Sequence, residues 1–252
     1  MLTGCAGSST PAPVTTLEIR KQQHQLRQQQ TLSGRSYQVQ RGDTLYSIAF
    51  RAGQDFRTVA ARNNIKAPYT IYPGQIIQLQ AGTAAKIKGS VTPTKSKSST
   101  AKSVAASSQK GYVQERSPVN ITQPASTAVG RVSWQWPVKG LILARFSTAE
   151  QGNKGVDIGG SAGSRINAAA DGQVVYAGNA LRGYGNLIII KHNDDYLSAY
   201  AHNKRLLVKE RQDVKAGQQI AEMGDTDAID TRLHFEIRFR GQSVDPLRYL
   251  PR

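Results

Sequence analysis

The chain has 252 residues, 38% of them hydrophobic, which suffices for one large or two small packed domains, and no apolar run reaches the roughly 18 residues that predict a membrane-spanning helix. An excess of 33 Lys and Arg over 17 Asp and Glu, net +16, favours a polyanionic neighbour, but no nucleic-acid-binding motif accompanies it, so nucleic acid is not the expected partner. The single cysteine excludes an intramolecular disulfide and a cysteine-rich metal cluster.

The start of the chain, Leu2-Thr3-Gly4-Cys5, resembles the lipobox of bacterial lipoproteins. The resemblance implies that Cys5 becomes the lipidated first residue of the mature chain, and Ala6 rather than Asp after it is typical of sorting to the outer membrane. Only Met1 precedes the box, so we expect a truncated signal peptide. The expected localisation is the periplasm, as an outer-membrane lipoprotein whose residues 1–36, rich in Ser, Thr, Pro and Gln, form a tether.

Residues 37–80 have the pattern of a small domain with the order strand, helix, helix, strand. Residues 37–39 and 76–79 alternate as short strands. Gly42-Asp43-Thr44 supplies a turn and a helix N-cap, and Asp55 can cap the second helix, which Asn63-Asn64 ends.

The motifs of this unit resemble those of LysM domains: YQVQRGDTLYSIA at its start, NNI in its middle and YPGQ at its end. The resemblance implies binding of peptidoglycan through its N-acetylglucosamine-containing glycan. In that family the sugar lies beside the two turns, which here comprise Gly42, Asp43, Thr44, Ile71, Pro73 and Gly74. These residues also have a structural role, because the first turn caps a helix.

The segment 81–130 is rich in Lys, Ser, Thr and Ala, with Glu115 as its lone acidic residue. Such a composition does not bury enough apolar surface to order itself, and it predicts a disordered, solvated linker. As a flexible coil of about 50 residues it would span roughly 40 Å.

Residues 131–252 show a succession of short strand patterns, with Asn193-Asp194-Asp195 as a hairpin signal between two apolar runs. The strands are expected at 141–143, 172–177, 187–192, 196–202 and 233–240. We therefore predict a mostly antiparallel β domain with a groove over one sheet, and an α+β fold class for the whole chain.

In the last of these strands Leu233, Phe235 and Ile237 alternate with polar residues, so Arg232 and His234 share the groove face. Two other stretches could converge there, one containing Asn153 and Asp157, the other Tyr200 and His202. Arginine has no lone pair and does not accept a proton, so it neither holds a metal ion nor acts as a base.

The strings GVDI, AAADGQVVYAG, YGN, YAH and LHFEI are similar to the lysostaphin/LytM family of zinc endopeptidases. The resemblance matches Asp157 and His234 to metal ligands and His202 to a histidine that supports catalysis. Asn153 stands where the first ligand histidine is expected, and Arg232 where the catalytic histidine is expected. We therefore expect no catalysis, no metal and no other cofactor, with Arg232 paired to Asp157 or Glu236 in the vacated space.

A lipobox, a LysM module and a degenerate LytM-like domain together resemble the NlpD-type lipoproteins. The resemblance implies a non-catalytic envelope protein that binds peptidoglycan and activates N-acetylmuramoyl-L-alanine amidases for daughter-cell separation. The groove expected to dock the amidase comprises Asn153, Asp157, Tyr200, His202, Arg232 and His234. Two alternatives stay open: a zinc-dependent peptidoglycan endopeptidase, and a passive tether between wall and membrane.

Overall fold

The computed structural model describes residues 32–80, here called the small domain, and 132–252, the large domain. Both described segments belong to one compact unit. The expectations for Cys5, for most of the tether and for the basic linker lie outside the described residues. Within the described ranges, no helix has the length and apolar composition needed to cross a membrane.

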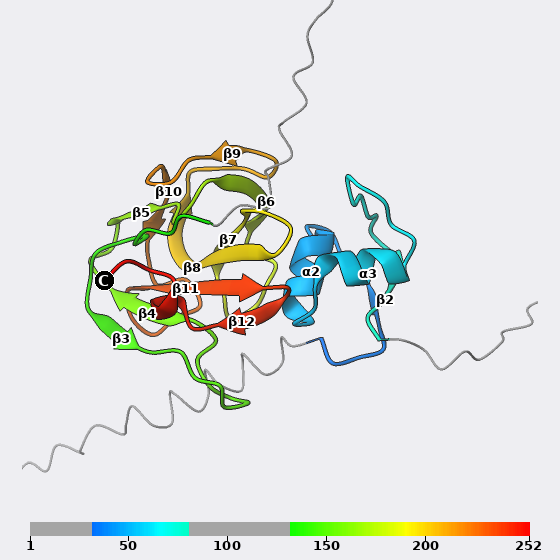
Figure 1. Ribbon diagram of the computed structural model, residues 1–252, viewed down its shortest axis with the longest axis horizontal. Helices are drawn as coiled ribbons and strands as arrows, with labels where there is room; N and C mark the ends of the chain where they lie inside the picture. The colour runs from blue at the N-terminus through cyan, green and yellow to red at the C-terminus, as the bar shows by residue number, and fades with distance from the viewer. Residues whose placement is uncertain (1–31, 81–131) are drawn as a thin grey trace, which may run out of the picture. The chain divides into compact units, whose positions relative to one another are not determined.

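The small domain has the order strand, helix, helix, strand, as the sequence predicts (Figure 1). Strands β1 (Ser36–Gln38) and β2 (Ile76–Gln78) pair antiparallel. Helices α2 (Leu45–Arg51) and α3 (Phe56–Arg62) pack on them. The core consists of Val39, Leu45, Ile48, Ala49, Phe56, Val59, Ala60, Ile77 and Leu79.

Both helices begin at the residues that the sequence identifies as N-caps. Thr44 and Ser47 form a capping box, in which each side-chain oxygen accepts a hydrogen bond from the backbone N–H of the other. The Asp55 carboxylate accepts from the backbone N–H groups of Arg57 and Thr58.

The predicted tether ends before residue 36, because Leu32 packs against the small-domain core.

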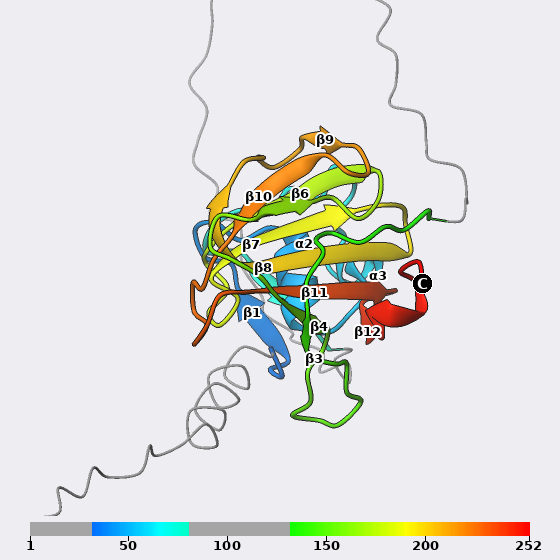
Figure 2. The ribbon, with the colours of Figure 1, turned by 90° about the vertical axis from the view of Figure 1, so that its left-hand side faces the viewer.

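The large domain is built on a ten-stranded sheet whose main path runs β3-β4-β11-β8-β7-β6-β9, with neighbouring strands antiparallel. Figure 2 shows β6, β7, β8 and β11 side by side. The strands are β3 (Ile142–Ala144), β4 (Val156–Gly159), β5 (Arg165–Asn167), β6 (Gly172–Gly178), β7 (Asn186–Lys191), β8 (Tyr196–Leu206), β9 (Asp213–Val214), β10 (Gln219–Met223), β11 (Arg232–Phe239) and β12 (Gln242–Val244), followed by the 3₁₀ helix η1 (Pro246–Arg248). The predicted fold class is confirmed.

The predicted hairpin joins β7 to β8. The Asn193 side-chain oxygen accepts from the backbone N–H groups of Asp195 and Tyr196, which closes the turn. The sequence did not predict β4, β5, β9, β10 and β12 as strands. They have two to five residues each, too few to display a clear alternation.

The central strands divide their side chains between two faces of the sheet. Leu233, Phe235 and Ile237 of β11 lie on one face, within a buried cluster that also contains Ile188, Ile190 and Tyr200. His234, Glu236 and Arg238 lie on the opposite face, directly across from Ala201, Ala199 and Leu197 of β8. We call this second face the groove face.

Candidate functional site

The groove face brings Asp157 and His234 together. They are cross-strand neighbours on β4 and β11, and His234 Nδ1 lies 2.6 Å from Asp157 Oδ1. Both residues are buried. Two residues 77 positions apart thus form a direct contact because the register of two antiparallel strands places them opposite each other.

Arg232 fills the space beside this pair. Its Nη1 lies 3.0 Å from Asp157 Oδ2, and its guanidinium also pairs with Asp230. Burial alone lowers the pKa of this arginine, but the two carboxylates outweigh burial and raise it. Arg232 is predicted to pair with Asp157 or Glu236, and the structure shows the pair with Asp157. This pair places a permanent cation beside the residue that the resemblance matches to a metal ligand.

The other ring nitrogen of His234 faces a second carboxylate. His234 Nε2 lies 3.1 Å from Glu236 Oε1, which also accepts a hydrogen bond from the Tyr184 hydroxyl. Glu236 Oε2 accepts from Arg238 Nε at 2.8 Å. Burial raises the pKa of Glu236, but the charge of Arg238 and the hydrogen bond from His234 outweigh it and lower that pKa to about 2. Glu236 is therefore a buried carboxylate that joins His234 to Arg238.

The contacts of Arg232, rather than those of His234, disagree with a catalytic zinc site. A ligand histidine donates from its second nitrogen to an outer carboxylate, and the contacts of His234 with Asp157 and Glu236 are compatible with that pattern. The Arg232 cation, however, pairs with Asp157, the residue that the resemblance matches to a metal ligand. In the ranges that the structure describes, no group of three or more His, Cys, Asp and Glu side chains is placed to hold a metal ion.

Asn153 lies in the loop that leads into β4. Its side-chain oxygen accepts from the backbone N–H of Gly155 at 3.3 Å, so it is engaged within its own loop. Its Nδ2 is buried and has no hydrogen-bond partner among the described residues. An amide in this position is a weak metal ligand compared with imidazole.

His202 and Tyr200 are separated by the sheet, although the sequence places both in the groove. His202 has a ring centroid 6.0 Å from that of His234, and its Nδ1 lies 2.8 Å from the backbone oxygen of Thr226. Tyr200 belongs to the core on the opposite face, where its hydroxyl accepts from the backbone N–H of Ala169. Its assignment to the groove is therefore wrong, and it is a core residue.

Arg238 is the residue that the sequence interpretation did not assign to the site. The signal was available, since Arg232, His234, Glu236 and Arg238 recur every second residue along one strand. Tyr184, in the loop between β6 and β7, also reaches the site, because its hydroxyl donates to Glu236 Oε1.

In the small domain, the two turns matched to glycan binding lie next to each other. Gly74 donates from its backbone N–H to the backbone oxygen of Val39 at 2.8 Å, and both Gly42 and Gly74 have positive φ angles. Asp43 accepts hydrogen bonds from the Tyr37 hydroxyl and the Gln40 backbone, and Thr44 caps α2. The polar side chains of the first turn therefore stabilise the turn itself.

Introducing histidine at both positions that the resemblance matches to histidines is expected to produce metal binding. In the double variant Asn153→His, Arg232→His the cation beside Asp157 is removed and two imidazoles are added, so we expect binding of one zinc ion in a calorimetric titration. The matched control is Arg205→His, a change of the same kind at an exposed arginine paired with Glu222. A double variant that gives no more heat than this control would contradict the assignment of the two positions.

Comparison with known proteins gives two domain matches. Residues 151–246 match the model of peptidase family M23, and residues 37–80 match that of the LysM domain. The chain is 46% identical over 259 residues to the murein hydrolase activator NlpD of Escherichia coli K12, covering 87% of this chain and 68% of that protein.

Two further relatives carry lipoprotein names. One is the lipoprotein YgeR of Escherichia coli K12, 48% identical over 221 residues, with 88% of this chain and 83% of that protein covered. The other is the outer membrane antigenic lipoprotein B of Haemophilus influenzae, 44% identical over 262 residues, with 87% and 64% covered. The expected combination of a LysM domain with a LytM-like, M23-type domain is thereby confirmed.

Proposed function

Because the chain belongs to the NlpD family of lipoproteins, we propose that it is a non-catalytic, peptidoglycan-bound envelope lipoprotein that activates N-acetylmuramoyl-L-alanine amidases. The observation that carries the proposal is the ion pair between Arg232 and Asp157, 3.0 Å apart in a buried position of the M23-type domain. The guanidinium stands at the position that the resemblance matches to the catalytic histidine, and it puts a permanent charge beside Asp157, which the resemblance matches to a metal ligand.

The contacts on the groove face argue against hydrolysis by this chain. A zinc hydrolase needs about three protein ligands, a bound water and a base to take its proton. Here Asn153 bonds to its own loop, and Arg232 carries a permanent charge beside Asp157. The groove then serves recognition, with Asn153, Asp157, His202, Arg232 and His234 proposed to contribute to the amidase-docking surface.

The small domain is proposed to hold the protein on peptidoglycan through the turns that contain Gly42, Asp43, Thr44, Ile71, Pro73 and Gly74. Near the N-terminus, Cys5 is proposed to carry a lipid that anchors the protein in the outer membrane on its periplasmic side. The names of the relatives, which include an outer membrane lipoprotein, support it.

Activation requires a difference in affinity between two states of the amidase. If the activator binds the open state about 100-fold more tightly than the inhibited one, it shifts the equilibrium by about 2.7 kcal/mol. No chemistry by the activator is needed. Charged groups such as Arg232 and Asp157 would give this docking its specificity.

The test is release of dye from labelled peptidoglycan by a purified amidase, with and without the full chain. We expect the full chain to raise the rate about tenfold or more, a shift of at least about 1.4 kcal/mol, and Arg232→Gln to lose most of this effect. Arg205→Gln is the matched control, because it neutralises an exposed arginine that also pairs with a carboxylate.

Two outcomes would support the other functions. Release of fragments by the chain alone, abolished by a chelator, would indicate a zinc endopeptidase. No acceleration of any amidase by a folded chain that still binds peptidoglycan would indicate a passive tether.

A further inference from the structure

The side chain of Phe50, in the last turn of α2, is buried against the large domain. Its exposure is only 2%, yet it is not part of the small-domain core. It belongs to a cluster with Leu187, Ile189, Leu197, Ala199 and Ala201, together with Val175, Tyr176 and Leu181. Ala199 and Ala201 lie directly across from Glu236 and His234, so Phe50 packs on the groove face.

Arg238 contacts both the Phe50 ring and the residues of the site. Its guanidinium carbon lies 3.8 Å from the centroid of the Phe50 ring, and its Nη1 donates to the backbone oxygen of Phe50 at 3.1 Å. The same guanidinium pairs with Glu236. A desolvated arginine over an aromatic face is a favourable contact, and through Glu236 it connects α2 to His234.

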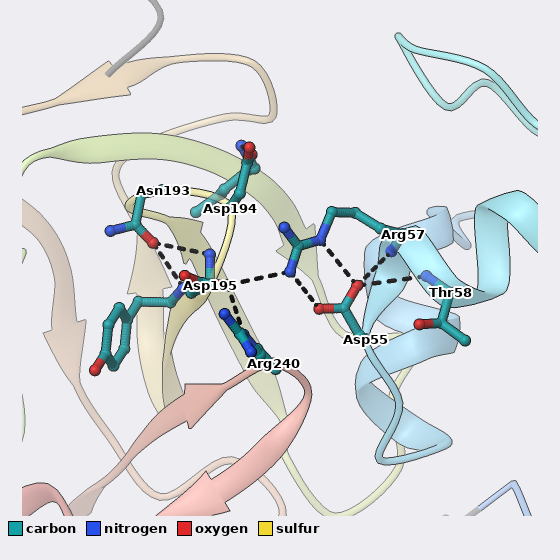
Figure 3. Close-up of polar contacts among 9 residues, drawn as sticks. Asp55, Arg57, Thr58, Asn193, Asp194, Asp195 and Arg240 are labelled. Carbon is teal, nitrogen blue, oxygen red and sulfur yellow. Dashed lines mark hydrogen bonds and ion pairs between the residues drawn. The ribbon is translucent and has the colours of Figure 1, made fainter. Parts of the chain in front are cut away.

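Polar contacts surround this anchor, and Figure 3 shows one group of them. Asp195, in the turn between β7 and β8, lies 2.9 Å from Arg240 Nε and 3.1 Å from Arg57 Nη2 of α3. Gln242 donates to the backbone oxygen of Gly53 at 2.7 Å. Hydrogen bonds from Arg240 and Arg57 lower the pKa of Asp195.

The turn between β11 and β12 is shaped for this contact. Gly241 has a φ of +81°, and a Cβ on it would lie 2.2 Å from the carbonyl carbon of Gln54. The backbones at Gly241 and Gln54 are therefore so close that only glycine fits at position 241.

Both domains line the cavity beside His234. It has a volume of about 370 Å³. The small domain contributes Phe50, Arg51 and Gly53, and the large domain contributes Tyr184, His234, Glu236, Arg238 and part of the loop 146–154. The end of α2 thus forms one wall of the cavity that His234 and Glu236 also line.

We propose that the small domain is an intramolecular cover for the groove face: in the closed state Phe50 occupies this face, and an amidase must displace it to dock. This inference rests on the proposed function, since it concerns the same surface. Apart from Phe50 and the partly buried Tyr46, which pack on the apolar cluster, and the close backbone approach at Gly241, the contact consists of hydrogen bonds and partly exposed ion pairs. Each of these contributes little, so the closed state can open.

A cross-link tests the cover. In a full chain with Cys5→Ser, Arg57→Cys and Asp195→Cys, the two new thiols lie on facing sides of the contact and are joined by a short bismaleimide. We expect efficient cross-linking within one molecule. If the closed state blocks docking, the cross-linked protein activates the amidase about tenfold less than the same protein before cross-linking.

Opening the contact is expected to have the opposite effect. Phe50→Asp, added to the cysteine pair, places a charge against the apolar cluster without touching the small-domain core. Cross-linking should fall to background, and amidase activation before cross-linking should rise. The matched control is Leu141→Asp, the same kind of change at a residue that is 80% exposed, which should alter neither quantity.

The readouts separate the two proposals. The yield of the cross-link requires no amidase, so its absence in the cysteine-pair protein that retains Phe50 would overturn the cover by itself. A cross-linked protein that activates as well as the open one would also overturn it, while the proposed function stands. If the protein without cross-link activates no amidase, the proposed function fails.

Discussion

Replacement of Glu236 by alanine is expected to destabilise the large domain by about 3–5 kcal/mol, as for other buried ion pairs that lose one partner. Glu236 is fully buried, and its carboxylate is within hydrogen-bond distance of His234, Tyr184 and Arg238. Without it, Arg238 retains its charge in a buried position. The melting temperature should therefore fall by roughly 10 °C or more.

Urea unfolding followed by tryptophan fluorescence measures this loss, because both tryptophans of the chain, Trp134 and Trp136, lie in the large domain. The matched control is Glu222→Ala, which breaks an exposed pair with Arg205 and should cost less than about 1 kcal/mol. In the double variant Glu236→Met, Arg238→Met both charges are removed, and part of the loss should be recovered. A loss for Glu236→Ala no larger than that of the control would contradict a buried ionised network.

Acidification from about pH 7 to about pH 4.5 is expected to destabilise the large domain through His192 by about 2–3 kcal/mol. Burial lowers the pKa of His192 from 6.5 to about 4. Its Nδ1 lies 2.7 Å from the backbone oxygen of Asp171, and its Nε2 lies 2.7 Å from Ser198 Oγ. Because the unfolded chain takes up the proton first, this stability is complete above pH 6.5 and is lost as the pH falls towards 4.

The comparison that isolates this effect is His192→Asn. Asparagine preserves a donor for Asp171 but does not titrate, so its free energy of unfolding should change less with pH over this window than that of the parent chain. The variant will be less stable at neutral pH because the bond to Ser198 is lost. Parallel pH profiles for the two proteins would show that His192 is not the group responsible.

His192 is also an example of a residue whose burial could not be predicted from the sequence. In the sequence, His192 follows the apolar run 187–190, a pattern that favours a polar residue at a strand edge, outside the groove. It does lie outside the groove, but it is buried, at 6% exposure. Burial of one polar residue depends on what packs above it, here Trp134, whose ring centroid is 4.8 Å away. The sequence pattern of a single strand carries no such information.

The amino-acid sequence determined the features that depend on local chemistry. The caps at Thr44 and Asp55, the Asn193 hairpin and the alternation along 232–239 follow from side chains that bond to nearby backbone or recur with the strand period. The sequence also predicted a carboxylate partner for Arg232, Asp157 or Glu236, since a buried cation requires one, and the structure shows that it is Asp157.

Only the tertiary structure decided which face Tyr200 occupies and what covers the groove. Tyr200 and His202 are two residues apart, and a regular strand would put both on one face, but His202 has a φ of +64°, which breaks the extended backbone and with it the alternation. Phe50 has the pattern of any apolar helix residue, yet its partners come from more than 120 positions further along the chain. Contacts of that kind arise from how two folded surfaces fit, a property that no local pattern encodes.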